Sequence, residues 1–246
     1  MDLKSLYNEV LEEENTFLKG KFRIKEDKRN SYYDIINNIK LFKSICHEYD
    51  MHIEDDYIKC NLSNLQLKYI QQVVNYLCKD SNLKPFYTFV GKSAEMVFRN
   101  IINRLFYLFR INKKIDLNVN NFIYDGDGGS DFNLASMSFD IKYRNDGPNH
   151  GLILDKSFLS RMNENINLIF VTNSSNIKLN ENSFQEGKSL PLAIKGWVSG
   201  KDFLEKSKQI NNGRESRALD IFNPIQDLIC QILDSEFERE KYFIYD

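Results

Sequence analysis

The sequence predicts a mixed α/β fold in which a central sheet of about four or five strands is flanked by helices. Two short apolar runs, Ile166–Thr172 and Leu192–Val198, have the length and composition of buried strands. A helical pattern follows the second run at Lys201–Lys206. Strands and helices that alternate along a chain in this way favour a layered core with helices on the faces of the sheet.

Residues 1–84 are predicted to form a mostly helical N-terminal region. Apolar residues recur at helical spacing in Leu3–Leu18 and in Tyr32–Tyr49. A third helix is predicted to begin at Ser63, because Ser63 is followed three residues later by Gln66, the pattern of a capping box. We place the end of this region just before Pro85, since the residue that precedes a proline disfavours helix.

The predicted core spans residues 85–208 and is followed by a C-terminal helical extension, residues 209–246. A helix of the core is expected to open at Gly91–Glu95 and to continue through apolar residues at helical spacing as far as Phe109. In the extension, Pro224 precedes an apolar helix at Ile225–Phe237. No internal repeat is evident in the sequence.

The stretch Tyr124–Asn145 carries the chemistry that we consider most informative. Its glycine-rich part, Gly126–Gly129, is expected to reverse the chain with positive φ angles. A strand at Phe132–Leu134 is then expected to pair with a second strand at Ser138–Tyr143. The sequence therefore predicts a hairpin with an acidic residue at its start.

Three charged side chains of this hairpin are expected to converge. Asp140 and Lys142 are two residues apart in a predicted strand, so they point to the same face, and Asp131 begins the neighbouring strand. Carboxylates in such an arrangement suit a hard cation such as Mg²⁺, and a nearby lysine can orient water or neutralise charge on a phosphate. The pattern predicts a metal-assisted site for a phosphate-containing substrate.

The arrangement resembles the signature of the PD-(D/E)xK nuclease superfamily, in which an acidic residue on one strand precedes acid-x-Lys on the next. Asp131 takes the first position here, and Asp140, Ile141 and Lys142 take the second; Ser130 stands where that signature has proline. The similarity extends over residues 86–207. It implies a restriction-endonuclease-like core, a hydrolase that cleaves DNA with Mg²⁺ or Mn²⁺, metal ligation by Asp131, Asp140 and the backbone carbonyl of Ile141, and a catalytic role for Lys142.

Glu95 has two interpretations. It is expected in the first turn of its helix, where a carboxylate is stabilised by the helix dipole and pairs with Arg99 four residues later. Alternatively, nucleases of the superfamily often carry a glutamate on the first core helix that reaches the metal, which implies a catalytic and metal-binding role for Glu95.

The cysteine and histidine residues, which can also bind metals, show weaker spacing patterns. Cys46, His47, His52 and Cys60 lack the paired spacing of a structural zinc site. The four cysteines show no C-x-x-C spacing, and we expect them to be reduced. His150 is the histidine nearest the acidic motif, where it is either a surface residue or a contact to substrate phosphate.

The net charge of −2 gives no general indication of nucleic-acid binding. Two segments are locally basic: Lys19–Arg29 holds six basic residues against two acidic ones, and Lys92–Lys114 holds six against Glu95. Such runs are either solvated charged faces or a rim that follows the phosphates of a nucleic acid. The sequence leaves both possibilities open.

These observations predict a cytoplasmic endonuclease that binds nucleic acid, most simply DNA, and no membrane. No apolar run approaches the length of a membrane span, and the N-terminus does not have the order of a secretory signal. The alternatives are a non-catalytic module that binds nucleic acid or protein on a nuclease-like scaffold, and a structural protein in which the D-x-K triplet is coincidental. Cleavage of both strands of a duplex would be achieved most simply by a homodimer, with Leu3–Leu18 or Ile225–Phe237 at its interface.

Overall fold

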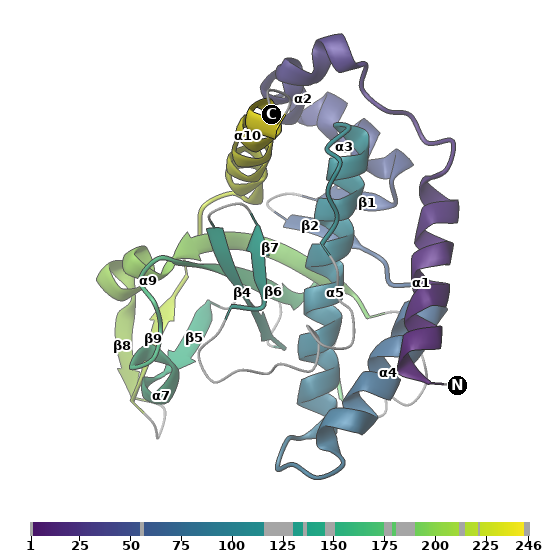
Figure 1. Ribbon diagram of the computed structural model, residues 1–246. Coiled ribbons are helices and arrows are strands. Elements are labelled where there is room, and N and C mark those ends of the chain that lie inside the picture. The colour runs from purple at the N-terminus through teal and green to yellow at the C-terminus, as the bar shows by residue number, and fades with distance from the viewer. Residues whose placement is uncertain are drawn as a thin grey trace.

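A computed structural model shows a mixed α/β protein with two β-sheets and with helices around the larger sheet (Figure 1). The structure describes residues 2–54, 57–115, 130–134, 137–145, 151–174, 179–180, 190–211, 215–220 and 222–243. All statements below refer to these residues. The predicted mixed α/β class is confirmed.

The larger sheet has six strands. Their spatial order is β1 (Met51–Glu54), β2 (Tyr57–Cys60), β7 (Leu192–Ser199), β6 (Ile166–Asn173), β4 (Met137–Arg144) and β3 (Phe132–Leu134). The β4–β6 pair is parallel and the other pairs are antiparallel. The predicted strands around 166–172 and 192–198 are therefore the centre of this sheet, and the predicted 132–134 strand pairs with β4 as expected.

A smaller sheet contains three antiparallel strands in the order β5 (Leu152–Asp155), β9 (Glu215–Leu219) and β8 (Lys208–Asn211). It lies on one side of β4 and β6 together with two short helices, α7 (Lys156–Leu159) and α9 (Gly200–Lys206). Apolar side chains of both sheets and of α9 form a small core there: Leu152, Leu154, Ile166, Leu168, Phe170, Val198, Phe203 and Leu219.

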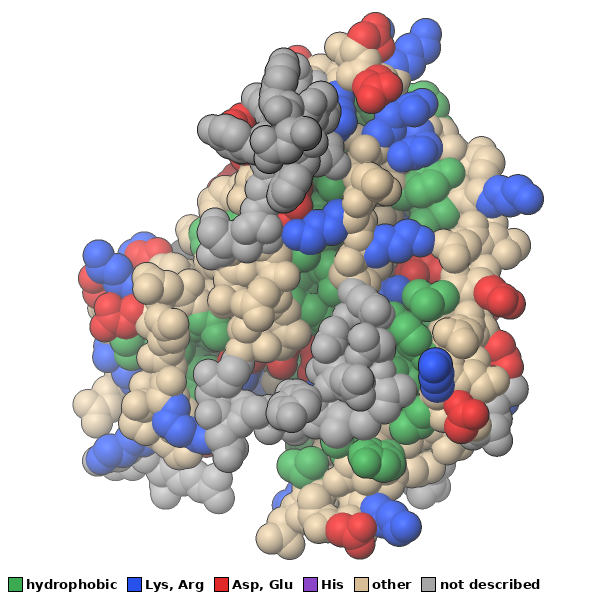
Figure 2. Space-filling view, viewed as in Figure 1, with side chains coloured by type: hydrophobic (Ala, Val, Ile, Leu, Met, Phe, Trp, Pro, Cys, Tyr) green, Lys and Arg blue, Asp and Glu red, His purple; other side chains and the backbone are tan. Residues whose placement is uncertain are grey.

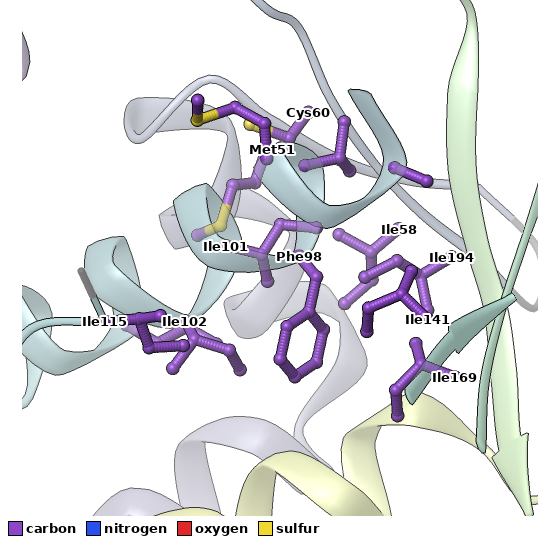
Figure 3. Close-up of a cluster of buried hydrophobic side chains, with 14 of the residues drawn as sticks. Met51, Ile58, Cys60, Phe98, Ile101, Ile102, Ile115, Ile141, Ile169 and Ile194 are labelled. Atoms are coloured by element: carbon purple, nitrogen blue, oxygen red, sulfur yellow. The ribbon is translucent and has the colours of Figure 1, made fainter. Parts of the chain in front are cut away.

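The opposite face of the larger sheet packs on the long helix α5 (Pro85–Leu108). Figure 3 shows Phe98 of α5 among buried residues of the sheet, including Ile141 and Ile169. The Phe98 ring also lies 5.5 Å from the ring of Phe132 and 5.7 Å from that of Phe139. This packing fixes β3 and β4 against α5.

The other helices complete the main core. They are α1 (Leu3–Leu18), the 3₁₀ helix η1 (Glu26–Ser31), α2 (Tyr32–Asn37), α3 (Ile39–Glu48), α4 (Asn64–Cys78) and α10 (Ile225–Phe243). The capping box at the start of α4 is present, since the Ser63 side chain accepts from the Gln66 backbone and the Gln66 side chain accepts from the Ser63 backbone. Along the described helices, none is both long and apolar enough to span a membrane.

Two helix boundaries differ from the predicted ones. The helix expected to open at Gly91 begins at Pro85, which occupies one of the first two helical positions after the extended Lys84. The helix expected over Tyr32–Tyr49 is broken at Asn38, whose ψ of 86° is not helical and whose side chain accepts a hydrogen bond from the Leu41 backbone. Asn38 starts a new helix because it caps that helix itself.

The expectation of a helical N-terminal region is incomplete, because a β-hairpin follows α3. The hairpin joins β1 to β2, and β2 pairs with β7, so residues on both sides of residue 84 belong to one sheet. The C-terminal segment from 209 onward likewise contains β9 and most of β8 before α10. Both ends of the chain therefore contribute strands as well as helices.

Candidate functional site

The β3–β4 pairing brings Asp131 and Asp140 together. Phe132 pairs with Phe139 and Asn133 with Ser138, so the same register places Asp131, the residue before β3, opposite Asp140. The Asp131 Oδ2 atom accepts a hydrogen bond of 2.6 Å from the backbone N–H of Ile141. That bond holds the Asp131 side chain against β4.

Asp140 and Lys142 lie on the face of the sheet that carries the smaller core. Their partners in the parallel register are Leu168 and Phe170, which belong to that core, whereas Ile141 belongs to the main core on the α5 side. Neighbours in register share a face, so strand alternation separates the charged pair from the α5 side. The two aspartates and the lysine therefore lie at the β3 edge, on the side of the smaller sheet.

Lys142 forms a close ion pair with Asp140. Its Nζ lies 2.7 Å from Asp140 Oδ1, and the Asp140 side chain is 6% exposed whereas that of Lys142 is 26% exposed. The Lys142 Nζ is also 4.1 Å from the centre of the Phe158 ring, which α7 supplies. A cation on an aromatic face is held by the ring quadrupole, so Phe158 restrains the position of the lysine.

Burial raises the pKa of Asp140 to about 7, and the neighbouring Asp131 carboxylate adds to the increase while Lys142 opposes it. Two carboxylates in a poorly solvated place repel one another, and a cation between them would relieve that repulsion. The electrostatics of the pair are thus those of a candidate cation site.

The backbone of Ile141 faces the same edge. In a β-strand the N–H and C=O of one residue point to the same side, and the Ile141 N–H points to Asp131. The Ile141 carbonyl accordingly points to the same side of β4 as its N–H, toward Asp131.

Glu95 comes from a different element than the two aspartates and Lys142. It lies on α5, on the other side of the sheet, and its carboxylate is 3.0 Å from Lys92 Nζ; both side chains are buried. Because α5 starts at Pro85, Glu95 is in the middle of the helix, so stabilisation by the helix dipole was a wrong expectation. The expected pair with Arg99 was also wrong, since Arg99 binds Glu14.

No group of three histidine, cysteine or acidic side chains arranged for a metal occurs within the described ranges. The metal-binding role of Glu95 stays a prediction. The glycine-rich turn 126–129 and His150 lie outside the described residues. Of the residues considered for zinc, Cys46 and Cys60 are buried free thiols, and the rings of His47 and His52 are 5.3 Å apart.

Several residues of the basic run Lys92–Lys114, on α5 and just after it, make internal contacts. Arg99 is fully buried and makes two hydrogen bonds to Glu14, and the buried Arg104 donates to backbone carbonyls. Lys113 pairs with Glu236 at 2.7 Å. The buried Arg99 and Arg104 are therefore not available to contact phosphates.

The run Lys19–Arg29 is more accessible. Figure 2 shows lysine and arginine side chains over the segment that joins α1 to α2, and Lys19, Lys25 and Lys28 in this segment are exposed. Arg23 is partly used internally, since it donates to the Tyr107 carbonyl. Its exposed lysines are compatible with both interpretations of the sequence, a solvated charged face and a rim that follows phosphates.

Phe158 is the residue of the site that the sequence did not indicate. It lies in the four-residue helix α7, which Asp155 caps by accepting a hydrogen bond from the Phe158 backbone. The pattern of an aspartate three residues before Phe158 signals a helix start. Its position over Lys142 results only from the packing of the smaller sheet on the larger one.

No family model, curated protein or solved structure matches this chain. The functional conclusion depends on the geometry of the hairpin and on the resemblance of its motif.

Proposed function

We propose that the protein is a Mg²⁺- or Mn²⁺-dependent nuclease, most simply a DNA endonuclease on a restriction-endonuclease-like core. The observation that carries this proposal is the pairing of Asp131 with Asp140 across the β3–β4 ladder, with Lys142 ion-paired beside them. The order of an acid on one strand and acid-x-Lys on the next is the order of the PD-(D/E)xK signature.

The donor set suits a hard divalent cation. Asp131 and Asp140 supply carboxylate oxygens, and the Ile141 carbonyl faces the same edge; such oxygen donors, completed by water and substrate phosphate, are what Mg²⁺ prefers. Glu95 remains a candidate for an outer or second-metal ligand. A bound ion would polarise the scissile phosphate and lower the pKa of a bound water.

The proposed role of Lys142 follows from its environment. Its ammonium is held between the Asp140 carboxylate and the Phe158 ring and is still partly exposed. From there the ammonium would orient the attacking water or stabilise charge that develops on the phosphate, whereas deprotonation of that water would require Lys142 in its neutral amine form. Asp140 fixes that ammonium group, so the loss of Asp140 would remove a metal ligand and displace the lysine together.

Cleavage assays test the proposal directly. The purified protein is incubated with plasmid DNA, single-stranded DNA and RNA in Mg²⁺, Mn²⁺ or EDTA. We expect cleavage that EDTA abolishes and that Asp140→Asn reduces by about a hundredfold to a thousandfold, as the loss of a group acting directly in catalysis does. Asp80→Asn, at an exposed position after α4, makes the same chemical change and is expected to cleave normally.

The other outcomes identify the alternatives. Retardation of nucleic acid without cleavage in any metal would assign a non-catalytic binding module. Neither retardation nor cleavage would favour a protein-interaction role, and an Asp140→Asn variant with full activity would refute the assigned site.

A further inference from the structure

A basic segment, Lys19–Arg29, follows α1 and extends into η1. It carries six basic and two acidic residues, a net charge of +4, whereas the whole chain has a net charge of −2. All other residues together therefore carry a net charge of −6. A local positive excess in a chain that is otherwise negative attracts polyanions to that part of the surface.

The backbone of the basic segment is fixed to the C-terminal ends of two helices. The Ile24 N–H donates to the carbonyl of Leu108, the last residue of α5, at 2.9 Å, and Arg110 Nε donates to the Ile24 carbonyl at 2.6 Å. The hydroxyl of Tyr49, the C-cap of α3, donates to the Phe22 carbonyl. Because this backbone is already held, binding a ligand to it costs less conformational entropy than ordering a free loop would.

The cations of the basic segment divide into two sets. Lys21 Nζ donates to the Glu48 carbonyl at 2.7 Å, and Arg23 Nε donates to the Tyr107 carbonyl at 3.0 Å, so these two cations are used internally. Figure 2 shows lysine and arginine side chains on the surface of this segment. Three of its lysines are exposed and form no ion pair with any side chain that the structure describes: Lys19, Lys25 and Lys28. Their ammonium groups are accessible to phosphates.

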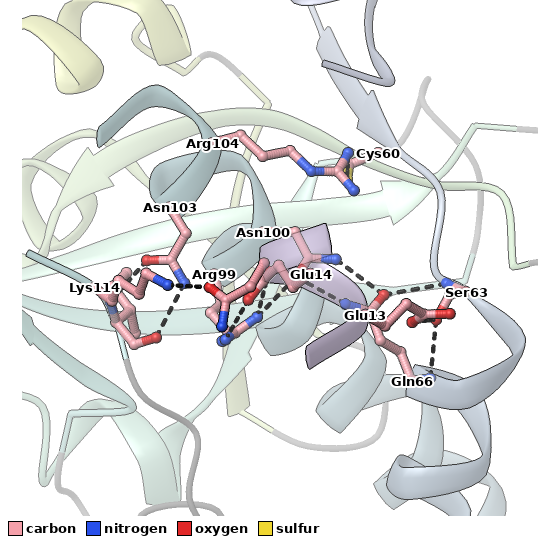
Figure 4. Close-up of polar contacts among 12 residues, drawn as sticks. Glu13, Glu14, Cys60, Ser63, Gln66, Arg99, Asn100, Asn103, Arg104 and Lys114 are labelled. Atoms are coloured by element: carbon pink, nitrogen blue, oxygen red, sulfur yellow. Dashed lines mark hydrogen bonds and ion pairs between the residues drawn. The ribbon is translucent and has the colours of Figure 1, made fainter. Parts of the chain in front are cut away.

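The arginines of α5 differ from these lysines, because they face groups of the protein. Figure 4 shows Arg99 directed toward Glu14 and Arg104 directed toward Cys60, with contacts of 2.7 and 2.9 Å. Both arginines are buried. The basic segment therefore offers a phosphate what the arginines of α5 do not, which is exposed cationic groups on a fixed backbone.

An exposed aromatic ring lies among these cations. Phe22 stands between Lys21 and Arg23 in the sequence and is 62% exposed. Surfaces that bind single-stranded nucleic acid combine cations along the phosphate backbone with aromatic rings on which bases stack. In a duplex the bases are already stacked on one another. An exposed ring beside exposed lysines thus fits a single strand better than a duplex.

Anionic membranes also attract basic segments, but they bind most stably where an apolar face can enter the lipid. The exposed apolar residues of α3, which meets the basic segment at Glu48 and Tyr49, are Ile39 and Leu41. They are two positions apart in the helix and therefore lie on opposite sides of it. This arrangement gives no common apolar face and favours nucleic acid over a membrane.

We propose that the basic segment is a binding surface for single-stranded nucleic acid. Its exposed lysines contact phosphates, and the Phe22 ring stacks on a base. The nine residue steps from Lys19 to Lys28 span at most roughly 30 Å, so the contact covers a short stretch of the strand. The proposal goes beyond the proposed cleavage and does not depend on it, because no residue of the hairpin takes part.

Fluorescence anisotropy in EDTA, which prevents metal-dependent cleavage, tests the proposal with the full chain. The probes are labelled oligothymidine and oligouridine of about 20 nucleotides, longer than the site of a typical binding domain, and a DNA duplex of the same length. We expect the single strands to bind at least about fivefold more tightly than the duplex, because only they can stack on Phe22. The DNA and RNA probes show whether the sugar matters.

Charge variants test the lysines. The triple variant Lys19→Gln, Lys25→Gln and Lys28→Gln is expected to bind more weakly and to reduce the slope of log K against log salt by about 2, since each phosphate contact to a single strand contributes about 0.7. The matched control is Lys4→Gln, Lys68→Gln and Lys79→Gln, which removes the same charge at three other exposed positions. We expect the control to keep the wild-type slope.

Two substitutions of Phe22 test the stacking. Phe22→Leu keeps an apolar side chain but removes the ring, and is expected to bind single strands about fivefold to a hundredfold more weakly. Phe22→Trp keeps an aromatic face and is expected to bind like the wild type. Because the Phe22 side chain is mostly exposed, both variants should keep the circular dichroism spectrum of the wild type.

Four results would overturn the proposal: the wild type binds no single strand, the duplex binds as tightly as the single strands, the basic-segment triple variant binds like its control, or Phe22→Leu binds like the wild type. Sedimentation with phosphatidylserine vesicles is measured in parallel. Binding to vesicles without binding to oligonucleotides would assign the segment to membranes instead. Cleavage is assayed separately in Mg²⁺, so failure of the nuclease proposal is distinguished from failure of this surface.

Discussion

At the scale of single residues, the Asp140 carboxyl is the group whose environment departs most from water near the candidate site. It is almost fully buried and faces Asp131, and Lys142 is its close cation among the residues that the structure describes. Burial of this carboxyl disfavours its ionised form in the folded protein. Such a cost to stability is typical of functional positions.

The stability of the protein should consequently depend on pH through Asp140. Its pKa is about 7 in the folded protein and about 3.8 in the unfolded chain, so between these values the folded state binds more protons and stability falls as pH rises. Asp140→Asn removes this dependence. In EDTA, we expect the free energy of unfolding of Asp140→Asn, relative to that of the wild type, to increase from pH 4 to pH 8. The increase should be at most about 4 kcal/mol at the standard 1.36 kcal/mol per pKa unit. Denaturant unfolding at both pH values measures it.

Divalent metal should reverse the difference in stability between Asp140→Asn and the wild type. If Asp131 and Asp140 bind Mg²⁺, saturating metal at pH 8 stabilises the wild type and leaves Asp140→Asn unchanged. An equal response of both proteins to Mg²⁺ would contradict the assigned ligands.

Glu95 can be tested for its two roles separately. In the described structure its carboxylate pairs with Lys92, so Glu95→Gln is expected to lower the free energy of unfolding by breaking a buried ion pair. If Glu95 also ligates metal, the variant loses activity beyond any loss of folded protein, and higher Mn²⁺ concentration partly restores it. Activity per folded molecule equal to that of the wild type would leave Glu95 with the structural role alone.

At the scale of secondary-structure elements, α5 organises the protein through both of its faces. Phe98 packs on β3 and β4, while Arg99 makes two hydrogen bonds to Glu14 of α1, at 2.7 and 2.8 Å. Arg99 is fully buried, and its Nε has no acceptor among the described groups. A buried charge pair therefore contributes to the attachment of α1, beside the apolar side chains that α1 places in the main core.

Glu14→Gln should destabilise the protein by about 3–5 kcal/mol, because it leaves the Arg99 charge buried without a counter-charge. Chemical denaturation measures the change. Glu12→Gln, at an exposed position of the same helix, is expected to lie within about 0.5 kcal/mol of the wild type. Similar values for the two variants would show that the pair does not hold α1 in place.

At the scale of the whole molecule, the terminal helices already have partners within the chain. α1 contacts α4, and α10 contacts α2 and β7. The exposed large apolar side chains of the described structure lie elsewhere, at Phe22, Tyr33, Ile39, Leu41, Tyr76, Leu83 and Tyr87. The apolar stripes of α1 and α10 are thus accounted for by the core.

We therefore expect the free protein to be a monomer. Light scattering at micromolar concentration should give a mass near 29.0 kDa, the value of a single chain. A dimer in the absence of DNA would show that another surface mediates association. A dimer that forms only with DNA would support cleavage of both strands by two copies.

The sequence by itself determined the local features of this protein. The period of the apolar residues located α1, β6, β7 and α9, the serine and glutamine at 63 and 66 defined the start of α4, and strand alternation put Asp140 and Lys142 on one face. Each of these depends on residues close together in the chain, whose spacing fixes which side chains share a face.

Only the tertiary structure decided the features that depend on distant partners. The strands β1 and β2 are too short for the sequence to distinguish them from the helices on either side. They form a strand pair in the fold because β2 also hydrogen-bonds to β7. The basic residues of α5 look like a solvent-facing run until Glu14 and the Tyr49 carbonyl are placed beside them. Phe158 contacts Lys142 because the fold brings these two residues, which are distant in the sequence, together. Burial and long-range pairing are set by the packing of the whole chain, and no local spacing encodes them.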